Sequence, residues 1–183
     1  MDHAEIYLED LQQAIAAIDL AEVKKVRQVL AEARDKGKQI FLCGNGGSAS
    51  TASHFVNDLG KGASVAGGEP FKVMALTDNI SWITALANDM SYEDIFVEQL
   101  RNFAGAGDVL IAISGSGNSP NVIKAVELAR QRDMTVVGWT GFDGGRLALL
   151  ADLPIVVNSH HMGRVEDIHV VLMHLVCYYF MEP

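Results

Sequence analysis

The sequence is poor in cysteine, with two in 183 residues, and it has no long uninterrupted apolar run. Cys43 and Cys177 lie far apart and show no metal-ligand or redox spacing, which predicts two buried thiols rather than a disulfide. No run of about 18 apolar residues occurs, so no membrane partner is expected. The residues after Met1 lack the basic and apolar segments of a signal peptide. We therefore expect a cytoplasmic, reducing compartment.

Positive charge and nucleotide-binding motifs are also scarce. The chain has 14 Lys and Arg against 23 Asp and Glu, a net charge of −9 that repels nucleic acid. The pattern G-x-x-x-x-G-K-[ST] of P-loop proteins is missing. Residues 44–49 do fit the dinucleotide pattern G-x-G-x-x-A, but Asp78 lies farther along than the roughly 20 residues expected for a ribose-binding acid. We expect no nucleic-acid partner and no nucleotide cofactor.

Apolar segments of strand length alternate with helical patterns through most of the chain. Strands are predicted at 39–43, 71–76, 108–113, 135–140 and 153–158, and helices at 49–60, 80–103, 119–132, 145–151 and 164–181. This alternation predicts an α/β fold with a five-stranded parallel sheet, doubly wound into a three-layer αβα sandwich. Ligands of such sheets bind beyond the carboxyl ends of the strands.

Two further helices are predicted before the first strand, at 4–18 and 20–36, with enough apolar residues for two sides. That surplus indicates packing between subunits. The length predicts one domain, with 1–37 as an N-terminal helical extension and 38–183 as the α/β core. The glycine-rich segment 61–70 is predicted to be an active-site loop, a subunit contact or a mobile surface loop.

Two Gly/Ser loops, Gly44 to Ser50 and Ser114 to Asn121, each join a predicted strand to a predicted helix. Glycines at such a turn let the backbone approach an anion, while helix amides and serine hydroxyls donate hydrogen bonds to it. The alternative is a simple helix cap, for which one serine suffices. Two such loops favour a phosphorylated ligand. The residues that carry this prediction are Gly46, Gly47, Ser48, Ser114, Gly115, Ser116 and Ser119.

Acidic and histidine side chains recur at helical spacing in two places. His54 and Asp58 share one helix face, which fits acid–base work, a metal ligand pair or a surface contact. Glu166 and His174 are separated by about 12 Å of helical rise, so they reach one ion only by leaning together or with help from a second subunit. His54, Asp58, Glu166 and His174 fit a zinc-type metal site or an acid–base set. His169 is equally compatible with a core position, and His3, His160 and His161 are predicted to be exposed loop residues.

The segments CGNGGSASTASHF, ALANDMSYEDIF, GDVLIAISGSGNSPNVIKAVELA, TGFDGG and EDIHVVLMH follow one another along the chain. In that order they resemble the sugar isomerase (SIS) domain family, and within it the sedoheptulose-7-phosphate isomerases. The resemblance implies a flavodoxin-like fold and a homotetramer with active sites at subunit interfaces. It also implies an aldose-ketose isomerase that turns sedoheptulose 7-phosphate into D-glycero-D-manno-heptose 7-phosphate through an enediolate.

By the same resemblance, Asp58 and His174 fall on catalytic positions, and His54 and Glu166 on positions that bind zinc in some members. Asn45 and Asp89 fall on sugar-contacting positions, and Ser48, Ser114, Ser116 and Ser119 on phosphate ligands. The chain departs from the family pattern at four of its motif positions. Asp58 stands for a glutamate, Glu166 for a glutamine, Gly163 for an aspartate and Gly115 for a threonine.

Two other functions remain open from the sequence. One is a non-catalytic protein of the same fold that binds a partner, as the homotetramer associated with the replication initiator DnaA does. The other is an isomerase of a different phosphosugar. The retained set of His54, Asp58, Glu166 and His174 favours an enzyme.

Overall fold

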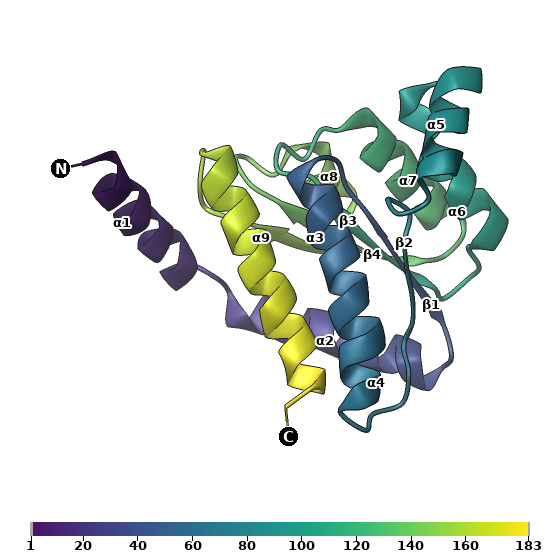
Figure 1. Cartoon of the computed structure of the whole chain (residues 1–183), viewed down its shortest axis with the longest axis horizontal. Coiled ribbons are helices and arrows are strands. Elements are labelled where there is room, and N and C mark those ends of the chain that lie inside the picture. Colours follow the sequence, from purple (N-terminus) through teal and green to yellow (C-terminus); the bar gives the residue numbers. More distant parts are fainter. Residues whose placement is uncertain (1, 183) are drawn as a thin grey trace.

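The computed structural model describes residues 2–182, in which a parallel sheet lies between two layers of helices (Figure 1). This arrangement confirms the predicted three-layer α/β fold. The strands are β1 (Gln39–Cys43), β2 (Lys72–Ala75), β3 (Val109–Ile113), β4 (Thr135–Thr140) and β5 (Leu153–Val156). The helices are α1 (His3–Ala16), α2 (Leu20–Asp35), α3 (Gly47–Val56), α4 (Ala63–Val65), α5 (Ile80–Asp89), α6 (Val97–Phe103), α7 (Pro120–Gln131), α8 (Gly145–Leu150) and α9 (Met162–Cys177).

The order of the strands in the sheet is β2-β1-β3-β4-β5, and all neighbouring pairs are parallel. After β1 the chain runs to β2 on one side and then returns to β3 on the other. The connections therefore diverge between β1 and β3, which creates a crevice beyond the carboxyl ends of these strands. Both Gly/Ser loops follow these two strands, so the topology alone places them side by side.

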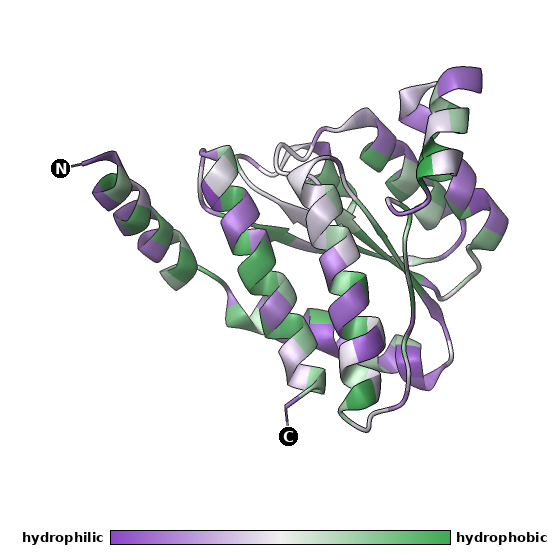
Figure 2. Ribbon diagram, viewed as in Figure 1, coloured by the Kyte–Doolittle hydropathy of each residue, from purple (hydrophilic) through white to green (hydrophobic). Residues whose placement is uncertain are grey.

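Alternate residues of each strand face opposite helical layers. Ile40 and Leu42 belong to an apolar cluster shared with α2, α3 and α9, while Phe41 and Cys43 belong to one shared with α6 and α7. Every residue of β3 is buried. Figure 2 shows hydrophobic residues along the strands, as expected for a sheet that is covered on both faces. Both cysteines are buried thiols, as predicted, and burial raises the pKa of Cys43 to about 12.

The two N-terminal helices form close to their predicted limits, but α1 projects from one end of the molecule (Figure 1). It packs against α9, where the Tyr7 hydroxyl donates to Asp167 over 2.5 Å. Its side chains Ile6 and Leu8 are 42% and 57% exposed. The predicted surplus of apolar surface is therefore present on this helix.

The prediction of a loop over residues 61–70 was wrong for its first part. Helix α3 continues through a π-helical segment, Asn57–Gly62, into α4, and irregular backbone begins only after Val65. The glycines here allow close packing instead of a loop: a Cβ on Gly60 would lie 3.0 Å from Val73 of β2, and one on Gly62 would lie 2.8 Å from the Met181 side chain. Helix α3 also starts at Gly47, two residues earlier than predicted.

His169 is a core residue of α9, one of the two roles that the sequence left open, and it does not belong to the group of His54, Asp58 and His174. Its ring lies against Trp139, and Nε2 lies 3.3 Å from the carbonyl oxygen of Thr140. Burial disfavours the charged imidazolium and lowers the pKa of His169 to about 4.

We expect His169 to make the protein less stable in mild acid. Its folded pKa of about 4 lies below the ordinary value of 6.5, so the stabilising contribution is complete above pH 6.5 and is lost as the pH falls toward 4. From pH 7 to about pH 4, the free energy of unfolding should fall by at least about 1 kcal/mol more for the wild type than for His169→Gln. Urea unfolding over this range measures both slopes, and equal slopes would contradict the assignment.

Candidate active site

A pair of asparagine side chains joins the two Gly/Ser loops. Asn45 of the first loop donates to Asn121 at the start of α7 over 2.8 Å, and Asn121 donates back over 2.9 Å. The hydroxyl of Tyr92 also donates to Asn45, over 3.0 Å. The loops therefore form one continuous rim over the crevice between β1 and β3.

The first loop brings the backbone to the start of α3 through Gly46, whose φ of 55° suits glycine. Among the described residues, no side chain caps α3, so its first amides are available to an anion. Ser48, in the first turn, is buried with 6% exposure. A Cβ on Gly47 would lie 2.7 Å from the carboxyl atoms of Glu166, so α9 touches the loop here.

The second loop carries three serines around a tight turn. The hydroxyl oxygens of Ser114 and Ser119 lie 3.1 Å apart, and Ser116 Oγ accepts from the amide of Asn118 over 3.2 Å. Within residues 2–182, no side-chain hydrogen bond caps α7 at Ser119, which disfavours the simple helix-cap alternative. Gly117 is required on two grounds: its φ is 67°, and a Cβ there would lie 2.0 Å from the carbonyl oxygen of Gly144.

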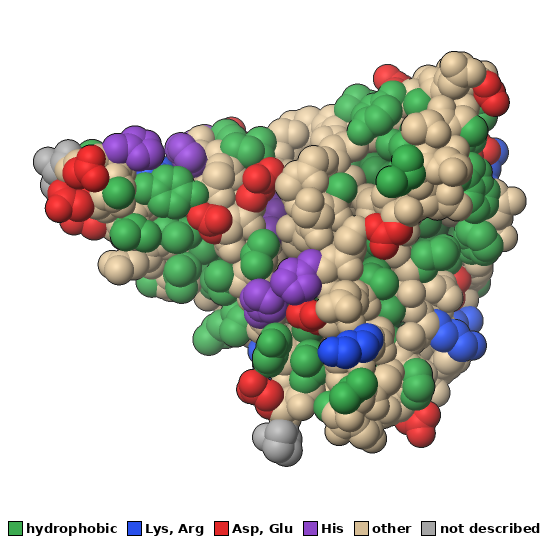
Figure 3. All heavy atoms as spheres, in the orientation of Figure 1, with side chains coloured by type: hydrophobic (Ala, Val, Ile, Leu, Met, Phe, Trp, Pro, Cys, Tyr) green, Lys and Arg blue, Asp and Glu red, His purple; other side chains and the backbone are tan. Residues whose placement is uncertain are grey.

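His54, Asp58 and His174 meet farther along α3 and α9, which lie side by side and run in the same direction (Figure 1). The Asp58 oxygen Oδ2 lies 3.3 Å from His54 Nε2 and 3.9 Å from His174 Nε2. The other carboxylate oxygen accepts from Asn57 over 2.9 Å. The Asp58 side chain is 14% exposed, whereas those of His54 and His174 are 45% and 42% exposed. Figure 3 shows histidine side chains gathered beside an acidic one at this surface.

The donor set of this group fits a divalent cation. One ligand atom from each of His54, Asp58 and His174 lies within 4.8 Å of the other two. Two imidazole nitrogens and a carboxylate oxygen are ligands that zinc accepts, and three protein ligands leave a position for water or substrate. An acid–base role for the same residues is equally compatible with this geometry.

Glu166 lies to one side of the group formed by His54, Asp58 and His174 and is not a member of it. Its carboxyl group contacts Gly47, and it shares with His54 a small cavity of about 280 Å³ between α3 and α9. Glu166 is therefore positioned between the first loop and the histidine group. This agrees with the long helical rise between Glu166 and His174.

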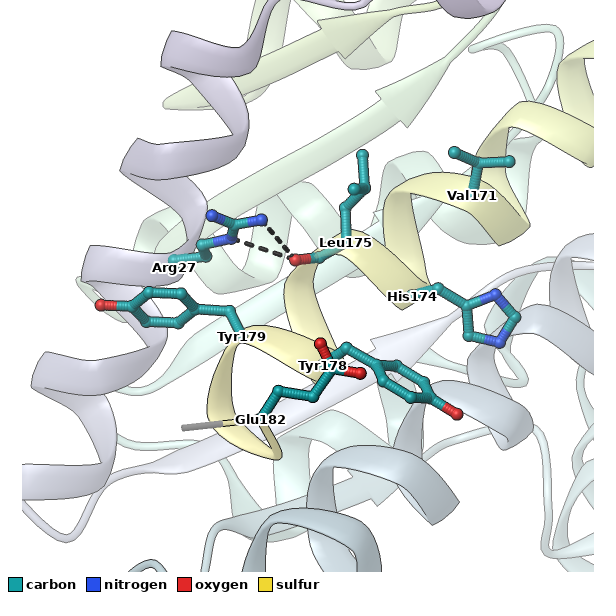
Figure 4. Close-up of a pocket in the computed structure, with 7 residues that line it drawn as sticks. All are labelled: Arg27, Val171, His174, Leu175, Tyr178, Tyr179 and Glu182. Atoms are coloured by element: carbon teal, nitrogen blue, oxygen red, sulfur yellow. Dashed lines mark hydrogen bonds between the residues drawn. The ribbon is translucent and has the colours of Figure 1, made fainter.

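An open cleft of about 770 Å³ adjoins His174 on its other side (Figure 4). Tyr178 lines it, with its ring 5.7 Å from the His174 ring, centroid to centroid. Arg27 of α2 crosses the cleft wall and donates two hydrogen bonds to the Leu175 carbonyl oxygen, over 2.6 and 3.1 Å. Solvent and ligands can thus reach the imidazole of His174 from this side.

Asp89, a predicted sugar-contacting residue, makes no hydrogen bond to either Gly/Ser loop among the described residues. It lies exposed at the end of α5, where its carboxylate accepts from Asn88 over 2.8 Å. Conversely, Tyr92, Asn121 and Tyr178 were not predicted. Asn121 ends the second Gly/Ser loop, where the pattern predicts no role for it, and no local signal in the sequence shows that Tyr92 reaches back to Asn45.

At two positions where glycine replaces the residue of the family pattern, Gly115 and Gly163, a neighbouring side chain occupies the space beside the glycine. A Cβ on Gly115 would lie 2.4 Å from Met162 Sδ, and a Cβ on Gly163 would lie 3.0 Å from the Tyr7 hydroxyl. His161 is exposed, as predicted, but it caps α9 by accepting from the Arg164 amide over 3.4 Å. The start of α9 is therefore packed in a way that suits glycine at both positions.

Comparison with known proteins identifies relatives along nearly the whole chain. The family described as SIS domain matches residues 6–141. The phosphoheptose isomerase of Shewanella denitrificans is 40% identical over 176 residues, covering 93% of this chain and 89% of that protein. That of Alteromonas mediterranea is 39% identical over 176 residues, with 93% and 88% coverage.

Solved structures agree. A phosphoheptose isomerase from Neisseria gonorrhoeae superimposes with a TM-score of 0.87 at 34% identity, covering 97% of this chain and 94% of that one. One from Francisella tularensis gives 0.91 at 27% identity, covering 98% and 97%. The chain therefore belongs to the SIS domain family, among the phosphoheptose isomerases.

Proposed function

We propose that this protein is an aldose-ketose isomerase that converts sedoheptulose 7-phosphate into D-glycero-D-manno-heptose 7-phosphate. Relatives that share about two residues in five over most of the chain are phosphoheptose isomerases. One observation in the chain itself carries the proposal. A carboxylate oxygen of Asp58 lies between the imidazoles of His54 and His174, on the helical segment that starts at the first Gly/Ser loop.

The two loops bind the phosphate in this proposal. Because the net charge of −9 repels an anion, local hydrogen-bond donors must hold the phosphate. These donors are the hydroxyls of Ser48, Ser114, Ser116 and Ser119 and the backbone amides of Gly46, Gly47 and Gly115. The Asn45 amide, held by Asn121, contacts the sugar hydroxyls. Asp89 and Glu166 complete the substrate-binding set.

The reaction moves a hydrogen between neighbouring carbons of the sugar. Asp58, as the base, takes the proton from C1, next to the C2 carbonyl, and returns it to C2. His174, as the acid, donates a proton to the C2 oxygen as the enediolate forms, and it takes the proton of the C1 hydroxyl when the aldehyde forms. The cleft beside His174 supplies the access that this exchange needs.

We further propose that His54, Asp58 and His174, with Glu166 nearby, hold a zinc ion. Two imidazoles and the Asp58 carboxylate make a donor set of suitable chemistry, and Glu166 lines the neighbouring cavity with His54. A bound zinc ion polarises carbonyl and hydroxyl oxygens of a substrate. A lone pair that binds zinc cannot also take up a proton, so Asp58 and His174 transfer protons only through atoms that the ion leaves free.

A homotetramer with active sites between subunits is the proposed assembly. Along α3 and its continuation, Ser48 and Asp58 are separated by about 15 Å of helical rise. A subunit packed across α3 and α9 would close the space between phosphate and acid–base group, and would bring a partner's Asp89 within range. The exposed apolar side chains of α1 and the cleft at Tyr179 offer surface for such packing.

A reducing, cytoplasmic setting is also proposed, because Cys43 and Cys177 are both buried free thiols. Within residues 2–182, no helix has the length and apolar character needed to cross a membrane.

Asp58→Asn should lower kcat at least about 100-fold, because the amide cannot act as the base. Conversion of sedoheptulose 7-phosphate, followed by NMR of the anomeric region, measures this loss. Asp35→Asn is the matched control, since Asp35 is 67% exposed at the end of α2, and it should retain wild-type activity. Full activity of Asp58→Asn would remove the base assignment, and no conversion by the wild type, with or without zinc, would remove the substrate.

Replacing one histidine of the group should weaken zinc binding. We expect His54→Gln to raise the zinc dissociation constant at least about tenfold, as measured by competition with a coloured chelator. His160→Gln serves as the control, because His160 pairs with Asp143 at a separate exposed site. Equal zinc affinity in the two variants would argue against the proposed ligands.

Sedimentation equilibrium should give a mass about four times that of the 19.8 kDa chain. A monomer that retains full isomerase activity would contradict active sites built between subunits.

A further inference from the structure

Met162, the first residue of α9, inserts its thioether into the second Gly/Ser loop. A Cβ on Gly115 would lie 2.4 Å from Met162 Sδ and 3.3 Å from its Cε. The backbone does not explain this glycine, because Gly115 lacks the positive φ found at Gly117. The chain conformation would allow a side chain at position 115, but its Cβ would displace the flexible end of Met162.

The second loop is held from two sides. On the side of β4, the amide of Gly141 donates to the carbonyl oxygen of Gly115 over 2.9 Å, and Gly117 lies against Gly144. On the side of α9, Met162 packs on Gly115, which lies between Ser114 and Ser116. A methionine side chain is flexible and polarisable, so it adapts to the backbone that it covers.

Helix α9 connects this contact with the rest of the site. Met162 and Glu166 are one turn apart on the same face, and Glu166 contacts the first loop at Gly47. His174, three turns from Met162, lies in the group with Asp58. The His161 side chain fixes where the helix starts by accepting from the Arg164 amide. One rigid helix thus touches both loops and the acid–base group.

We propose that Met162 is a positioning residue for the phosphate end of the substrate, acting through its contact with Gly115 on the second loop. The inference rests on the proposed function, since it concerns the loop that binds the phosphate there. Met162 itself is 43% exposed, and its removal leaves the apolar clusters on both faces of the sheet intact.

Met162→Ala should raise the KM for sedoheptulose 7-phosphate about fivefold, with kcat within about twofold of the wild type. A purely structural role would not separate KM from kcat in this way. Met162→Leu, which keeps the volume and apolar character, should restore KM to within about twofold. Isothermal titration with inorganic phosphate should show the same order of affinities without any turnover.

A double-mutant cycle tests the contact with Gly115. Gly115→Ala alone should raise KM several-fold, because its Cβ pushes the thioether out of the loop. In the Met162→Ala background the space is open, so the same change should alter KM by less than about twofold. Fully multiplicative effects would show that the two positions act independently and would overturn the inference.

Leu149→Ala is the control for loss of a large apolar side chain, because Leu149 is 86% exposed on α8. Its KM and phosphate affinity should equal those of the wild type. If the wild type binds inorganic phosphate but Met162→Ala binds it equally well, the positioning role is wrong and the proposed function stands. If the wild type binds neither phosphate nor sedoheptulose 7-phosphate, the proposed function fails and this inference fails with it.

Discussion

The packing of α9 beside α3 is the constraint on which the site depends. These two helices follow different strands and come from distant parts of the sequence, yet they run in the same direction over one face of the sheet (Figure 1). Their contact places Glu166 against Gly47 and brings His174 within 3.9 Å of Asp58. The buried residues Phe55 and Leu172 belong to the apolar cluster that fixes this spacing. Without that apolar cluster, nothing would hold α3 and α9 at the spacing that brings the polar groups of the site together.

The sheet positions the two Gly/Ser loops. Because β1 and β3 are neighbours with diverging connections, the loops that follow them meet at one edge. Asp58 lies in the π-helical segment Asn57–Gly62, which continues α3. Such segments occur often at functional sites, since they reorient side chains at a local cost in hydrogen bonding. The site therefore combines a rigid edge for an anion with a less regular stretch that carries the carboxylate.

Much of this architecture was predictable from the sequence, because it follows from short-range patterns. The apolar run of β3 and the spacing of His54 and Asp58 are visible without coordinates. The reciprocal bonds of Asn45 and Asn121 depend on strand order, which no local pattern encodes. The segment after Gly60 was misread as a loop because glycine also serves close packing. Likewise, the reason for glycine at position 115 lies in Met162, 47 residues away.

The amide pair across the crevice has a consequence for how the loops behave. Each of the two asparagines gives one N–H and takes one in return, an arrangement that two opposite orientations would satisfy equally well. The Val122 amide breaks this symmetry, because a backbone N–H can only donate and needs the Asn121 oxygen in front of it. The side chains can turn over only together, and only by setting donors against donors. One peptide N–H in the first turn of α7 thus fixes which way both amides point at the mouth of the crevice.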